Sequence, residues 1–347
     1  MTESADKMLR GRRVLSRVAG PVLRVRTVLV PPALALMVPA FILMSACAPE
    51  PVRITIPSST AVPSPRIPST IRVQVHESGA LVVREIPLEQ YVETTILSEV
   101  HPDPTDEPVA QRLFEVQAIL ARTYAVTNAG RHAKDGFDLC STTHCQLYEP
   151  ARLKTSRWVQ AAHEAVRRTA GKLLWFGNQP ARAVFHADCG GHTSDAAAVW
   201  CGTGVPYLVG APDTCPDHME WTFDARAAAL LSALNADPRT NVGVALDQVE
   251  VSGRDTAGRA ELITLRGTRT FVVRGEVFRD VVTRSLGAKS LRSTLFSVKR
   301  TGEHFLFSGR GYGHGVGLCQ AGAAARIRAG ASPADVLLHY FPGTSLR

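Results

Sequence analysis

The spacing of apolar residues divides the chain beyond residue 70 into a helical part and a strand-rich part. Helical spacing predicts three helices, at about 87–99, 109–128 and 156–170. Alternating apolar and polar residues predict strands at 247–252, 260–266, 270–273, 296–300 and 304–308. Helices and strands do not alternate as βαβ units, so we expect an α+β fold with mostly antiparallel strands. We expect one large two-lobed domain with a central substrate groove.

Turn residues complete this outline. Ser78-Gly79 lies within an alternating segment, 71–85, and predicts a β-hairpin. Gly177-Asn178 predicts a second hairpin between 172–176 and 181–187. A helix is expected near 225–235. The chain closes with a glycine-rich loop that leads into a helix, and with a short helix before Pro342.

The N-terminus predicts export. Residues 1–27 carry seven basic and two acidic side chains, and residues 28–46 carry no charge. A basic segment before an apolar run is typical of an export signal. The run ends at Met44-Ser45-Ala46-Cys47, which resembles a lipobox, so Cys47 is a candidate lipidated N-terminus. The alternatives are an uncleaved anchor helix interrupted by prolines, and plain secretion.

The leader also explains most of the basic charge. It contributes +5 (seven basic minus two acidic) of the formal +8, which leaves about +3 and does not suggest nucleic-acid binding. Residues 48–69 are rich in proline and predict an extended spacer of at most about 70 Å. We therefore divide the chain into a leader or anchor (1–47), a linker (48–69) and a folded domain (70–347). The domain would lie outside the cytoplasm, near the outer face of the cytoplasmic membrane.

Glu99 is the carboxylate of greatest interest. It continues the helical face formed by Leu88, Val92 and Ile96. A carboxyl held against apolar packing has a raised pKa, as a general acid needs at neutral pH. The alternative is a structural glutamate that hydrogen-bonds to a loop or pairs with Arg122.

Two further segments are dense in polar groups. Residues 311–317 place four glycines around His314, so another group must approach that backbone closely. This is neither a dinucleotide-binding fingerprint nor a P-loop. Residues 186–194 contain Cys189 with His186 and His192, which also admits a thiol nucleophile with a histidine base. Each segment is equally compatible with a turn of purely structural importance.

The cysteines leave two questions open. Two thiols and two imidazoles within fourteen residues suit a tetrahedral zinc site, formed by His132, Cys140, His144 and Cys145. The alternative there is a Cys140–Cys145 disulfide that closes a small loop. Cys201 and Cys215 flank a turn-rich loop and are expected to form a disulfide.

Seven segments, in order, resemble the stage II sporulation protein D family, whose domain is shared with amidase enhancers of the LytB type. They are 86–100 (IPLEQYVETTILSEV), 115–126, 140–150, 185–200 with 206–208, 291–296, 311–323 (GYGHGVGLCQAGA) and 337–344. The departures are Val100-His101 in place of Met-Pro, an acidic and proline-rich loop at 101–108, and Cys201 and Cys319 in place of Gly and Ser.

The resemblance implies a peptidoglycan lytic transglycosylase with Glu99 as its single acid and base. Such an enzyme cleaves glycan strands between N-acetylmuramic acid and N-acetylglucosamine and leaves a 1,6-anhydro product. The resemblance also implies structural zinc at the Cys–His set, with no metal needed for the chemistry. The alternative is a non-catalytic wall-binding module that stimulates a separate amidase. Residues expected to line the groove are Arg122, Tyr124, His186, Thr193, Ser194, Tyr312, His314 and Gln320.

Overall fold

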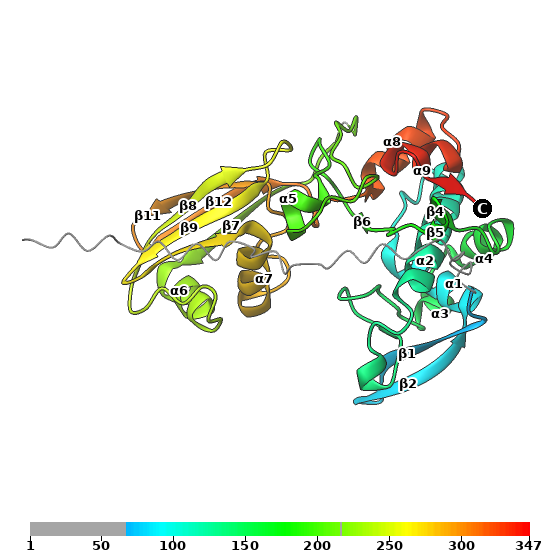
Figure 1. Ribbon diagram of the computed structural model, residues 1–347, viewed down its shortest axis with the longest axis horizontal. Helices are drawn as coiled ribbons and strands as arrows, with labels where there is room; N and C mark the ends of the chain where they lie inside the picture. The colour runs from blue at the N-terminus through cyan, green and yellow to red at the C-terminus, as the bar shows by residue number, and fades with distance from the viewer. Residues whose placement is uncertain (1–66, 216) are drawn as a thin grey trace, which may run out of the picture. The chain divides into compact units, whose positions relative to one another are not determined.

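A computed structural model describes residues 67–215 and 217–347 (Figure 1). About a third of the described residues are helical and the strands form several small sheets, so the expected α+β class is confirmed. The helices are α1 (Leu88–Glu99), α2 (Glu107–Asn128), α3 (Arg152–Thr155), α4 (Val159–Arg168), α5 (Ala196–Trp200), α6 (Ala227–Asn235), α7 (Gly275–Leu286), α8 (Gln320–Arg328) and α9 (Pro333–Tyr340).

The strands pair mostly in antiparallel fashion. They are β1 (Thr70–Glu77), β2 (Ala80–Pro87), β3 (Leu139–Cys140), β4 (Leu174–Phe176), β5 (Gln179–Pro180), β6 (Phe185–His186), β7 (Glu220–Arg226), β8 (Leu246–Arg254), β9 (Ala260–Gly267), β10 (Thr270–Arg274), β11 (Phe296–Thr301), β12 (His304–Arg310), β13 (Leu318–Cys319) and β14 (Ser345–Leu346). The sheet orders are β2-β1-β3, β10-β9-β8, β11-β12-β7, β13-β6 and β14-β4-β5. The pairs β1–β3 and β6–β13 are parallel.

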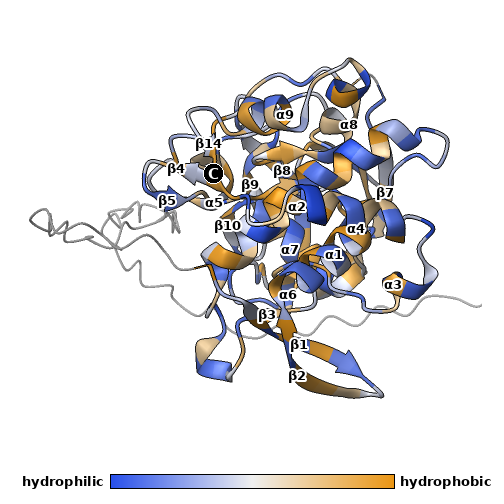
Figure 2. Cartoon of the chain, turned by 90° about the vertical axis from the view of Figure 1, so that its right-hand side faces the viewer, coloured by the Kyte–Doolittle hydropathy of each residue, from blue (hydrophilic) through white to orange (hydrophobic). Residues whose placement is uncertain are grey.

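The first hydrophobic core surrounds α2. This helix begins at an Asp106 cap, whose side chain accepts a hydrogen bond from Val109 N, and proline occupies its first turn. Small buried residues such as Ala118, Ala121 and Ala125 let neighbouring helices approach closely. Helices α1, α4, α8 and α9 all contact α2. Figure 2 shows hydrophobic residues also on the β1–β2 hairpin, where Leu81 and Val83 are exposed.

A second, separate core lies between residues 221 and 307. It joins the β8–β10 and β7–β11–β12 sheets to α6 and α7. The rings of Phe278, Phe296 and Phe307 meet there, with centroids 5.5–6.2 Å apart. Burial of these aromatic side chains gives the strand-rich part its own source of stability. A central groove between lobes stays a prediction.

Most elements expected from the sequence are present. The second predicted hairpin is present at its turn, because β4 pairs with β5 across Gly177-Asn178. The extent of its second strand is wrong: β5 is only Gln179–Pro180, and β6 pairs with β13, more than 130 residues later in the chain. Helix α7 was not predicted from the sequence. Its apolar residues Phe278, Val281 and Val282 have helical spacing, but they lie between segments of strand-like alternation.

The prediction of Cys47 lipidation, the leader 1–47 and most of the linker 48–69 lie outside the described residues. Within 67–215 and 217–347, every helix is too short or too polar to span a bilayer.

Candidate functional site

Glu99 is the last residue of α1 and is partly buried. Its Oε1 accepts a hydrogen bond from the main-chain N–H of Leu147, at 2.6 Å. The pKa of Glu99 is raised to about 7. Burial is the largest cause, the Leu147 hydrogen bond opposes it, and the negative charge of Glu149 adds to it. A carboxyl with this pKa is partly protonated at neutral pH and is able to donate or accept a proton.

The segment 146–149 is held firmly against α1. Tyr91 donates a hydrogen bond to Gln146 Oε1 at 3.1 Å, and its ring stacks on Tyr148 with centroids 5.4 Å apart. Ser98 Oγ accepts a hydrogen bond from Glu149 N at 3.0 Å. The Leu147 N–H is therefore fixed by its neighbours on both sides, and it positions the Glu99 carboxylate.

The other two carboxylates of α1 have different partners. Glu89 forms a two-point ion pair with the fully buried Arg122, at 2.6 and 2.8 Å. Glu93 faces His163 at 3.3 Å. The alternative in which Glu99 pairs with Arg122 is therefore wrong, whereas the alternative of a hydrogen bond to a loop describes one of its contacts. Arg122 also donates to the carbonyl of Lys172, so its described contacts are structural. Its contact with substrate stays a prediction.

Gln320 reaches Glu99 from the C-terminal part of the chain. Its Nε2 donates to the main-chain oxygen of Glu99 at 3.4 Å and to Gln117 Oε1 at 3.3 Å. Gln320 is the first residue of α8, directly after β13. Gln320 was one of the residues expected to contact substrate, and the structure places it beside Glu99.

The predicted metal-binding set comes together near this site. Cys145 Sγ lies 3.4 Å from His132 Nε2 and 3.8 Å from His144 Nδ1, and Cys140 Sγ lies 3.6 Å from His144 Nδ1. Tetrahedral zinc with N and S ligands places those atoms about 3.4 to 3.8 Å apart. Both thiols are free, so the alternative Cys140–Cys145 disulfide is wrong.

A carboxylate and a tyrosine surround this Cys–His set. Asp135 lies 3.6 Å from His132 Nδ1, where it orients the ring. Tyr124 is buried beside Cys145, and its hydroxyl accepts a hydrogen bond from Arg131 at 3.2 Å. Burial raises the pKa of Tyr124 to about 12. The donor set therefore fits a structural zinc ion, which would fix the start of the segment that holds Glu99.

The remaining predicted residues gather around the glycine-rich loop 311–317. The imidazole rings of His186 and His314 lie 5.5 Å apart, and burial lowers the pKa of both. Ser194 N donates to Gly315 O at 2.8 Å, and Tyr312 pairs with Asp188 through main-chain hydrogen bonds. Thr193 is buried and bonded to the main chain of Ala211. The glycines of this loop predicted that another group approaches its backbone closely. The main-chain hydrogen bonds with Ser194 and Asp188 confirm this.

Two cysteine hypotheses do not match the structure. Cys189 is fully buried, so its thiol is shielded from any substrate in solution. Cys215 is a free thiol whose Sγ faces the carbonyl of Asp217, so the predicted Cys201–Cys215 disulfide is wrong.

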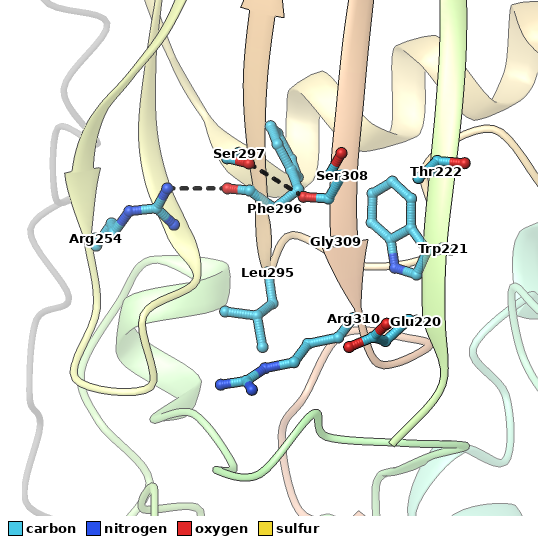
Figure 3. Close-up of a pocket in the computed structure, with 10 residues that line it drawn as sticks. All are labelled: Glu220, Trp221, Thr222, Arg254, Leu295, Phe296, Ser297, Ser308, Gly309 and Arg310. Carbon is cyan, nitrogen blue, oxygen red and sulfur yellow. Dashed lines mark hydrogen bonds between the residues drawn. The ribbon is translucent and has the colours of Figure 1, made fainter. Parts of the chain in front are cut away.

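Two of the open cavities formed by the described residues border the strand-rich part. One of about 600 Å³ lies beside the β7–β12–β11 sheet, where Arg254 donates to the Phe296 carbonyl and Trp221 forms part of the wall (Figure 3). A second of about 630 Å³ includes Asp188 and His218, which are 2.7 Å apart. Glu99 lines neither cavity. His218 was not predicted from the sequence because its partner, Asp188, lies thirty residues earlier in the chain.

Comparisons with known proteins agree with the motifs. A family model described as stage II sporulation protein matches residues 76–176, and a domain of unknown function matches residues 216–317. The chain is 28% identical over 296 residues to stage II sporulation protein D of Bacillus subtilis, covering 80% of this chain and 79% of that protein. It is 28% identical over 288 residues to an amidase enhancer of Bacillus subtilis, covering 70% of this chain. The match spans only 39% of that enhancer's length.

Proposed function

Since the chain belongs to the family of stage II sporulation protein D and the amidase enhancers, we propose that it acts on the bacterial cell wall as a lytic transglycosylase of peptidoglycan. The observation that carries this proposal is the partly buried Glu99 carboxyl, with its pKa near 7 and a main-chain donor on Oε1. The substrate is the glycan strand of alternating N-acetylmuramic acid and N-acetylglucosamine.

The proposed reaction needs one carboxyl. Protonated Glu99 donates to the glycosidic oxygen, the bond to C1 breaks, and an oxocarbenium-like sugar forms. The 6-hydroxyl of the same sugar attacks C1, and Glu99, now ionised, accepts the hydroxyl proton. The product carries a 1,6-anhydro bond, and no water is consumed. Hydrolases need a second carboxylate at the bond. The other carboxylates of α1 and the nearby Glu149 already have partners: Glu89 pairs with Arg122, Glu93 faces His163, and Glu149 pairs with Arg152 at 2.8 Å, which fits the one-carboxyl scheme.

The chain's own residues have separate tasks in this scheme. The Leu147 N–H holds one carboxylate oxygen, and the wall of α1 and segment 146–149 limits access of water to Glu99. Gln320 fixes the end of the helix through the Glu99 carbonyl. A zinc ion held by His132, Cys140, His144 and Cys145 would supply a structural cross-link. The proposed location is the outer face of the cytoplasmic membrane, tethered through Cys47 or an anchor helix.

The test is mass spectrometry of muropeptides after digestion of purified cell walls. The wild-type protein should release fragments with anhydro ends, and Glu99→Gln should reduce them at least 100-fold while keeping the same circular dichroism spectrum. Glu93→Gln on the same helix is the matched control and should cleave normally. Normal cleavage by the Glu99 variant would exclude Glu99 as the acid.

The similarity to an amidase enhancer favours a second candidate function. In that case the protein binds glycan without cutting it and stimulates a separate wall amidase. It predicts no anhydro product from either protein and equal stimulation of an added amidase by wild type and Glu99→Gln. The same digests, run with and without a purified amidase, separate the two functions.

A further inference from the structure

A second group of potential metal ligands is buried where β6 pairs with β13. One ring nitrogen of His186 and the Sγ atoms of Cys189 and Cys319 all lie within 4.8 Å of one another. All three residues are buried, and both thiols are free. The ligands come from two segments, 186–189 and 319, that the parallel pairing brings together.

Main-chain N–H groups point at both sulfur atoms. Cys319 Sγ accepts hydrogen bonds from Cys189 N at 3.2 Å and Gly322 N at 3.3 Å. Cys189 Sγ accepts one from Gly191 N at 3.3 Å. A neutral thiol is a weak acceptor, whereas N–H donors directed at sulfur are typical of metal-bound thiolates.

His186 has the hydrogen bonding of a ligand. Its Nδ1 lies 3.2 Å from the Val316 carbonyl, so Nδ1 carries the proton and donates it. Nε2 is buried and has no hydrogen-bond partner among the described residues. A carbonyl that fixes one ring nitrogen while the other keeps a free lone pair is the usual arrangement around a metal-bound histidine.

We propose that His186, Cys189 and Cys319 bind a zinc ion, separate from the Cys–His set near Glu99. Two thiolates balance the charge of a divalent ion in a closed core, and an N and S donor set selects zinc over magnesium or calcium. Bonds of about 2.3 Å to sulfur and 2.0 Å to nitrogen bring the ligand atoms to about 3.5 to 3.8 Å, so side chains need to move by about 1 Å.

A further donor close to this group is the buried Asp213 carboxylate, whose Oδ2 accepts a hydrogen bond from Cys189 Sγ at 3.6 Å. Tyr340 of α9 donates to the same oxygen at 2.6 Å. The ion would therefore join segment 186–189 to the first turn of α8, and through Asp213 it would adjoin α9. Its role is to fix α8, whose first residue, Gln320, contacts Glu99.

Zinc per chain, measured by elemental analysis of the full-length protein in detergent, tests the proposal. Wild type should carry two ions. Cys319→Ser should carry one, and serine keeps the cap on Gly322 N, which limits damage to the fold. Cys140→Ser with Cys145→Ser is the matched control: it should also lose one ion but keep the one at His186. Cobalt substituted into this control should give the thiolate charge-transfer band of a tetrahedral site.

Three results would overturn the proposal. One is zinc content that Cys319→Ser leaves unchanged. Another is a Cys140→Ser, Cys145→Ser protein that folds and holds no ion. The third is a wild-type mass lower by two hydrogens with a linked Cys189–Cys319 peptide, which would make the pair a disulfide. The second and third measurements do not depend on the Cys319 variant folding.

Discussion

Replacing Glu99 by glutamine should change how the stability of the protein depends on pH. Burial moves the pKa of this carboxyl from 4.5 to about 7. At 1.36 kcal/mol for each pKa unit, the folded state of the wild type loses about 3 kcal/mol when Glu99 ionises. Below pH 4.5 the group is protonated in both the folded and the unfolded state, so this loss is absent there. It develops as the pH rises from about 4.5 to 7 and is complete above 7.

Glutamine does not titrate, so the variant avoids this loss. The free energy of unfolding of Glu99→Gln minus that of wild type should therefore increase by about 3 kcal/mol between pH 4 and pH 8. Urea denaturation at half-unit pH steps measures the difference, and the constant effect of exchanging the hydrogen bond to Leu147 cancels. In the same window, transglycosylase activity of the wild type should fall with rising pH around 7, because the acid must be protonated. A stability difference that stays flat from pH 4 to 8 would refute the raised pKa.

Three other substitutions test neighbouring features. Arg122→Met should lower the free energy of unfolding by about 2 to 4 kcal/mol, because it removes a fully buried guanidinium with an ion pair and a carbonyl partner. Gly322→Ala should destabilise by about 2 kcal/mol although alanine favours helices, because its Cβ would clash with the Asp213 carboxylate. Glu149→Gln should shift the alkaline limb of activity to lower pH, because the Glu149 charge raises the pKa of Glu99.

Each of these substitutions has a control or a result that would contradict its prediction. Gly204→Ala meets only a methyl group at 4.0 Å and should be neutral in the same urea titration. Unchanged stability of Arg122→Met would assign that side chain to substrate instead of to the fold, and a raised KM would support this. An activity profile of Glu149→Gln that overlays the wild type would show that solvent screens the Glu149 charge.

The sequence predicted the part of the site that depends on local spacing. The helical face of Leu88, Val92 and Ile96 predicted that Glu99 is partly buried, and the short spacing of Cys140, His144 and Cys145 predicted their convergence. Both predictions rest on residues within about three helical turns of one another along the chain.

Contacts between distant segments were not predictable in the same way. The group that donates a hydrogen bond to Glu99 is the main-chain N–H of Leu147, forty-eight residues away. Nearly every residue type has a main-chain N–H, so the sequence does not indicate which one will contact Glu99. The pairing of β6 with β13 brings His186 to Cys319 across a long separation, and two-residue strands are too short to show alternation. The ion pair of Arg122 with Glu89 likewise depends on how α1 and α2 cross.

The contact between Gln320 and the end of α1 has a consequence for how the Glu99 site forms during folding. Helices α8 and α9 both pack against α2, and both follow the strand-rich part in the sequence. Helices α1 and α2 can therefore meet early through contacts that are short in sequence, whereas the Gln320 contact spans 221 residues. The surroundings of Glu99 are complete only after α8 has docked on α2, so any variant that loosens this docking should disturb Glu99 while leaving α1 helical.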